Sequence, residues 1–91
     1  MNQQQTAALA LSLVGDYDST IVAPVLDDWA NGRAFRPQDR HRLFILGDWI
    51  AARLGQPRTD DARRAIEPAK LTAEQTAALT ALMQTVEEAT K

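Results

Sequence analysis

The residues of this chain that could carry out acid–base or metal chemistry are few and scattered. His41 is the single histidine, and cysteine is absent, which removes disulfides, thiolate metal sites and cysteine nucleophiles together. A catalytic or metal-binding His41 would need a second histidine or a converging pair of carboxylates, and no residue stands at a suitable spacing. We therefore predict no catalytic site, no metal site and no cofactor, so that the protein is not an enzyme.

Three pairs of aspartates lie close together in the sequence, at predicted turns and helix starts. The pairs are Asp16 with Asp18, Asp27 with Asp28, and Asp60 with Asp61. Helix capping and a favourable interaction with the helix dipole explain Asp60 and Asp61 without any acid–base role. The chain also has no glycine-rich phosphate loop and no serine elbow, so we find no motif for phosphoryl or acyl transfer.

A different group of residues is suited to protein recognition. In residues 31–36 Phe35 stands close to two arginines in a predicted loop, and Arg40 follows Arg36 by four residues. Aromatic and arginine side chains are enriched among the residues that dominate binding energy at interfaces. We therefore predict a partner-binding surface at Arg33, Phe35, Arg36 and Arg40. The alternative is that Phe35 plugs the end of a helical bundle while the arginines lie along it with their charged ends in water.

The net charge of −2 conceals an uneven distribution along the chain. Residues 1–32 carry four aspartates and no basic residue, residues 33–64 carry eight arginines and four aspartates, and residues 65–91 carry four glutamates and two lysines. Such a central basic band could meet nucleic acid or an acidic partner, or the acidic helices that flank it could neutralise it within the fold. The sequence leaves both interpretations open.

The stretch IAARLGQPRTDDARRAI, residues 50–66, is similar to a DNA-binding helix-turn-helix in its first half. The similarity consists of an apolar helix end and a turn glycine, formed by Ile50, Ala51, Leu54 and Gly55. The motif requires apolar side chains six and nine residues after the glycine, where this chain has Asp61 and Arg64. The similarity therefore covers only these residues and fails at two required positions.

One extra residue in the turn would restore a packed pair of helices over residues 50–66. The side chains facing the first helix would then be Ala62, Ala65 and Ile66. Those facing outward would be Arg58, Arg63 and Arg64. Asp60 and Asp61 would then stand at the end of the second helix that enters the major groove, where they repel phosphates. The sequence pI of about 5.2 is also low for a DNA-binding domain. DNA binding through Arg58, Arg63 and Arg64 is therefore our second hypothesis. The alternative explanation of residues 50–66 is a simple αα corner with no role in DNA binding.

The elements that must position these residues are predicted to be helical throughout. Sixteen residues are alanine, the best helix former, whereas valine and isoleucine are scarce and only 5% of the chain is aromatic. We predict an all-α bundle of four or five helices in a single domain, residues 1–91. The helices are expected near residues 3–14, 20–31, 37–54, 60–66 and 73–89.

Proline, glycine and capping residues set the predicted boundaries. Pro24 is tolerated only in a first turn, which places the start of the second helix near Ala23, after a polar turn at residues 16–20. Thr59 or Asp60 is a suitable N-cap for the fourth helix. The last helix has the clearest start, because Thr72 and Gln75 match the capping box.

The third helix, residues 37–54, is predicted to be central. One apolar stripe consists of Leu43, Leu46, Ile50 and Leu54. The stripe is widened by Phe44, Ile45 and Trp49. A helix that is apolar on much of its circumference is typical of packing on two sides. The alternative is a break at Gly47 that leaves Asp48 as the N-cap of a second piece.

We infer from the sequence a small non-catalytic protein-binding module, a regulator or inhibitor of another bacterial or phage protein. The abundance of alanine and arginine beside only two lysines suggests such a source. Because the core of so small a domain is thin, we expect a homodimer. No stretch approaches about 18 consecutive apolar residues, and the N-terminus lacks a basic signal-peptide region. We therefore expect a cytoplasmic protein with no membrane partner.

Overall fold

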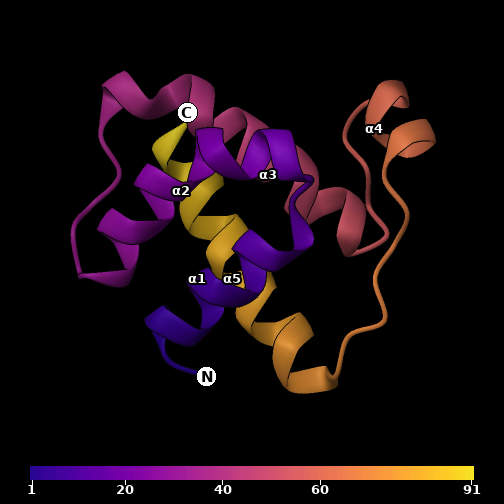
Figure 1. Ribbon diagram of the computed structural model, residues 1–91, viewed down its shortest axis with the longest axis horizontal. Helices are drawn as coiled ribbons and strands as arrows, with labels where there is room; N and C mark the ends of the chain where they lie inside the picture. The colour runs from indigo at the N-terminus through magenta and orange to yellow at the C-terminus, as the bar shows by residue number, and fades with distance from the viewer.

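Five α-helices and one short 3₁₀ turn make up the computed structural model, which describes residues 1–91 (Figure 1). In chain order they are α1 (Gln3–Leu13), α2 (Asp16–Ala30), the 3₁₀ turn η1 (Pro37–Asp39), α3 (Arg40–Arg53), α4 (Asp60–Ala65) and α5 (Ala73–Ala89). The predicted all-α bundle is confirmed, and the fold contains no strand. None of the helices combines the length and the hydrophobicity needed to cross a membrane.

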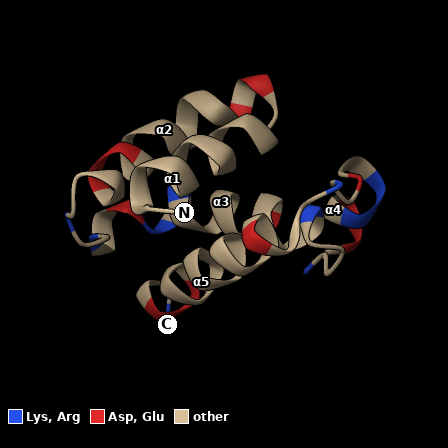
Figure 2. Ribbon diagram, turned by 90° about the horizontal axis from the view of Figure 1, so that it is seen from below, with Lys and Arg blue, Asp and Glu red and all other residues tan.

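Helix α3 is the central element, as its apolar pattern predicted. It contacts η1 and each of the other four helices. Figure 2 shows α1 and α2 on one side of α3 and α5 on the other. The main core joins these four helices, and its largest fully buried side chains are Leu26, Leu43, Leu46, Ile50, Leu79, Leu82, Val22, Val25 and Val86. One copy of the chain thus contains a continuous core, and the homodimer stays a prediction.

The predicted start of the second helix is wrong, because α2 begins at Asp16 and includes the residues assigned to a polar turn. Gly15 takes the N-cap position with an extended backbone, and Asp16 and Asp18 lie in the first turn, where they face the positive end of the helix dipole. Pro24 therefore lies inside the helix rather than in its first turn. The favourable first turn and the packing of α2 on α1 and α3 outweigh the cost of this proline.

An arginine from α3 supports the helical turn that precedes Pro24. Proline has no N–H to donate to the carbonyl four residues earlier, so hydrogen bonding in that turn is weakened. The guanidinium of Arg42 donates from Nη1 at 2.8 Å to the carbonyl oxygen of Ile21, which lies in this turn next to the Thr20 carbonyl that lacks its helical donor. Part of the basic band is therefore used to bind backbone carbonyl groups within the fold.

Helix α3 runs without a break through Gly47, so the alternative of two pieces is wrong. Gly47 is buried, and a Cβ atom added to it would lie 2.7 Å from Nη2 of Arg58. The absence of a side chain therefore gives the Arg58 guanidinium room to lie against α3. A requirement for space explains this glycine better than a helix break does.

Helix α4 is attached to the bundle through a small second core. It has six residues and packs chiefly on α3, and Figure 1 shows it standing apart from the other helices. The Thr59 hydroxyl accepts a hydrogen bond from the backbone N–H of Ala62 at 3.0 Å, so the N-cap is Thr59 and not the alternative, Asp60. Three buried residues form this core beside Trp49, namely Ala52, Ala62 and Ile66.

Arg53 joins three segments at the end of α3. Its Nε donates to the carbonyl oxygen of Leu13 at 3.0 Å, and its Nη1 donates to that of Glu67 at 2.9 Å. The guanidinium also lies 5.5 Å from the centre of the Trp49 ring. Arg53 thereby connects the end of α1 with the chain that follows α4, which helps to hold α4 in place.

Candidate functional site

The predicted partner-binding loop lies between α2 and η1, and its phenylalanine faces the core. Phe35 is half-buried and packs against the main core, as the plug interpretation of the sequence proposed. Beside it lies an open hollow of about 450 Å³ between this loop and the end of α5, whose lining includes Trp29 and Glu88. Much of the apolar surface of Phe35 is therefore already used for folding.

The three arginines of this predicted surface are engaged within the chain. Arg33 Nη1 lies 2.8 Å from Asp28 Oδ1, and Arg36 Nη2 lies 3.9 Å from the other oxygen of the same carboxylate. Arg36 Nε also donates to Asp39 Oδ2 at 3.3 Å. Arg40 Nη2 donates to the carbonyl oxygen of Thr90 at 3.2 Å. Figure 2 shows basic residues in this loop and acidic residues at the end of α2 next to it.

Of the three arginines of the DNA-binding hypothesis, one precedes α4 and contacts α3, and the other two lie on α4. Arg58 is exposed, and its guanidinium lies against α3, where it binds Asp48 and the carbonyl oxygen of Phe44. Arg63 and Arg64 are exposed on α4, with Arg63 Nη1 3.9 Å from Asp60 Oδ1. Helix α4 has fewer than two turns, and Asp60 and Asp61 occupy its first turn. Ala65, expected to face inward, is exposed at the edge of a groove.

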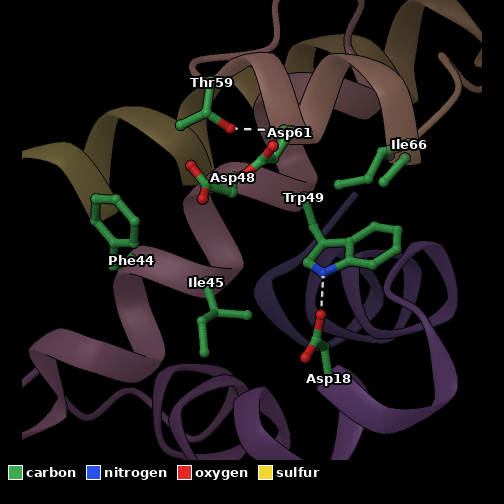
Figure 3. Close-up of a pocket in the computed structure, with 10 residues that line it drawn as sticks. Asp18, Phe44, Ile45, Asp48, Trp49, Thr59, Asp61 and Ile66 are labelled. Carbon is green, nitrogen blue, oxygen red and sulfur yellow. Dashed lines mark hydrogen bonds between the residues drawn. The ribbon is translucent and has the colours of Figure 1, made fainter.

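That groove lies between α3, α4 and the start of α2, and we refer to it as the α3–α4 groove (Figure 3). It has a volume of about 420 Å³ and is open to solvent. Its hydrophobic lining consists of Phe44, Ile45, Trp49, Ala62, Ala65 and Ile66. Its polar lining consists of Asp18, Asp48, Thr59 and Asp61. The groove therefore has apolar walls and several carboxylates.

Phe44 stands at one end of the groove with 54% of its surface exposed. The sequence placed it in the widened apolar stripe of α3, but it does not pack in the core. The guanidinium carbon of Arg58 lies 5.2 Å from the centre of the ring. Arg58 is itself held by Asp48 Oδ1, which accepts from Nε at 3.1 Å and from Nη2 at 3.0 Å, and by the Phe44 carbonyl at 3.1 Å.

Trp49 forms a fixed part of the groove wall. Its Nε1 donates to Asp18 Oδ2 at 2.7 Å, as Figure 3 shows. The ring packs between the main core and the small core of α4, and it lies so close to Gly15 that a Cβ there would be 3.1 Å away. A tryptophan held by a hydrogen bond and by packing gives the groove a preformed wall.

The charged side chains that line the groove are all acidic. Three of its lining residues are aspartates, and none is lysine, arginine or histidine. Asp48 is paired with Arg58, whereas Asp61 makes no ion pair and no hydrogen bond. The Thr59 hydroxyl is used to cap α4. This arrangement can bind an apolar side chain that has positive charge beside it.

The α3–α4 groove was not among the predicted sites, although the sequence carries one signal for it. Phe44 has Arg40 and Asp48 four residues before and after it, so both of its neighbours along the helix surface are polar. This spacing indicates an exposed face for Phe44. The role of Arg58 had no comparable signal, because it depends on how the chain turns after α3.

Comparisons of this chain with protein-family models, with curated proteins and with solved structures found no match.

Proposed function

We propose that this chain is a small non-catalytic module that binds another protein through the α3–α4 groove. The observation that carries the proposal is the position of Phe44, an aromatic side chain 54% exposed at the end of an apolar groove. A large aromatic ring gives much buried area at low cost in conformational entropy when a partner covers it. Its contact with Arg58 fixes the ring before binding, which reduces that cost further.

The polar groups of the groove support binding rather than catalysis. The Thr59 hydroxyl accepts a backbone N–H, and Asp48 is paired with Arg58. Asp18 accepts the indole N–H of Trp49. These three groups have structural partners, and Asp61, the remaining one, is an exposed carboxylate without a hydrogen-bonded nucleophile or acid, so the groove holds no activated nucleophile and no paired acid and base. A module of this kind would act by covering part of its partner, as a regulator or an inhibitor.

Site-specific photo-crosslinking tests this proposal. A benzophenone amino acid in place of Phe44 is expected to give a covalent adduct with a protein in the native host. The matched control carries the same group in place of Ala81, which is exposed on α5 and lines none of the hollows. An adduct at position 44 and not at position 81 would support the proposal. Equal labelling at both positions, or no protein adduct at position 44, would contradict it.

DNA binding through Arg63 and Arg64 predicts a different result and is tested separately. It would shift a duplex in a gel at low salt, with a log–log salt slope of about one per phosphate contact. We expect no shift, because Asp60 and Asp61 stand in the first turn of the same short helix. A salt-dependent shift that Arg63→Ala and Arg64→Ala remove would favour DNA binding instead.

A further inference from the structure

We propose that the partner segment in the α3–α4 groove is a cationic amphipathic helix, a conclusion that rests on the proposed function. Such a helix has an apolar face with lysine or arginine residues along its borders. The apolar face would contact Phe44, Ile45 and Trp49, and the basic residues would approach the carboxylates at the rim. Charge and backbone hydrogen bonding support this inference independently.

The charge of the rim selects a basic partner. The groove lining contains three carboxylates and no basic side chain. Two arginines contact lining residues of the groove, and both are bound elsewhere. Arg58 is bound by Asp48 and by the carbonyl oxygen of Phe44. Arg53, which lies over the Trp49 ring, donates to two backbone carbonyl oxygens. Asp61 has no partner, and Asp18 uses only Oδ2 to accept the Trp49 N–H. An acidic segment would meet like charge at two sites, whereas a basic segment would gain a partner at each.

The backbone of the protein favours a helical partner over an extended one. The walls of the groove come from helices, whose backbone N–H and C=O groups are bonded within each helix, and the fold has no strand with a free edge. An extended peptide would therefore find no backbone partners along the apolar walls. A helix satisfies its own backbone groups and presents apolar side chains at intervals of three and four residues. Packing of a helix in a groove is thus the mode that this surface permits.

Two synthetic peptides test the charge of the partner. Both are helices of about 16 residues with the same leucine stripe, and the other positions are lysine in one and glutamate in the other. The lysine peptide is expected to shift the NMR signals of the Trp49 indole N–H and the Phe44 and Asp61 amides. The indole N–H of Trp29, outside the groove, serves as the reference. The glutamate peptide should bind about tenfold more weakly or not at all.

Paired variants test whether the groove itself is responsible. Asp61→Asn should weaken binding of the lysine peptide about twofold to fivefold, the range expected for a partly exposed ion pair. Asp60→Asn is the matched control, because Asp60 lies in the same first turn of α4 but does not line the groove. Phe44→Ala should weaken binding about thirtyfold, the effect of a binding hot spot. Tyr17→Ala removes an aromatic ring that is 82% exposed outside the groove lining and should leave binding unchanged.

Four results would overturn the inference. The first is that the glutamate peptide binds as tightly as the lysine peptide or more tightly, and the second is that Asp60→Asn and Asp61→Asn weaken binding of the lysine peptide equally. The third is that the NMR signals shift only in the loop at residues 31–36. The fourth is that the protein self-associates and Phe44→Ala abolishes this self-association. The last result would mean that a second copy occupies the groove. Crosslinking at position 44 does not depend on partner charge. A protein adduct there together with failure of the lysine peptide would reject this inference and leave the proposed function standing.

Discussion

Two regions of the molecule combine a phenylalanine with arginine side chains, namely the loop at residues 31–36 and the α3–α4 groove. In the loop, Phe35 packs against the main core and its neighbouring arginines bind Asp28 and Asp39. In the groove, Phe44 is exposed and Arg58 lies against its ring. The two regions have similar composition, but Phe35 is half-buried against the core, whereas Phe44 is largely exposed.

The difference shows that composition alone does not identify a binding surface. Arginine and aromatic residues are common at interfaces because they give area and directed hydrogen bonds. The same properties make them useful inside a small domain, where arginine binds free carbonyl groups at helix ends and an aromatic ring fills the end of the core. The direction that the ring faces decides whether it fills the core or is available to a partner. This direction depends on the packing of whole helices.

The largest expected effect is the loss of stability in Phe35→Ala. Removing a half-buried ring from the edge of the core should lower the free energy of unfolding by about 2–3 kcal/mol, which is less than for a fully buried phenylalanine. The melting temperature should fall by roughly 8–20 °C. Phe44→Ala should change the free energy of unfolding by less than about 1 kcal/mol, since its ring is largely exposed. Thermal unfolding, monitored by circular dichroism, compares the two variants. Equal losses of stability would remove the distinction between the two regions.

The second prediction concerns Arg53, which forms a further arginine–aromatic pair with Trp49. Arg53→Ala should destabilise the protein by about 2 kcal/mol, because it removes hydrogen bonds to two backbone carbonyls. Chemical denaturation measures this change. Arg64→Ala is the control, since Arg64 is exposed and makes no hydrogen bond or ion pair. Similar midpoints for the two variants would show that Arg53 does not hold these segments together.

A third prediction separates the fixing of Phe44 from overall stability. Gly47→Ala should displace the Arg58 guanidinium, because the new Cβ would lie 2.7 Å from Nη2. The free energy of unfolding should change by less than about 1 kcal/mol, since the gain in helix propensity offsets the weakened contact with Asp48. NMR should show a change in the ring signals of Phe44 while those of Phe35 stay the same. Unchanged Phe44 signals would mean that Arg58 does not fix the ring.

The smallest effect is expected in the loop. Arg33→Ala should change the free energy of unfolding by less than about 0.5 kcal/mol, because its ion pair with Asp28 has an arginine side chain that is 68% exposed. Thermal unfolding at low and high salt provides the measurement. A much larger loss that salt abolishes would show that this ion pair stabilises the loop more than its exposure indicates.

The sequence by itself determined the elements that depend on neighbouring residues. Alanine content predicted helices, and the stripe of α3 predicted its central place. Thr72 marked the start of α5, and Thr59 or Asp60 marked the start of α4, which the structure confirms for Thr59. These features follow from local backbone propensity, capping and the periodicity of side chains, which involve residues within about four positions of one another.

The tertiary structure alone decided the features that depend on contacts between distant segments. The packing of α2 on α1 and α3 placed Pro24 inside a helix, against its local preference. The turn after α3 brought Arg58 back to Gly47 and Asp48, ten or more residues earlier in the chain. The α3–α4 groove exists because α4 meets Trp49 and Ala52 on one side only, and no local rule in the sequence specifies that approach.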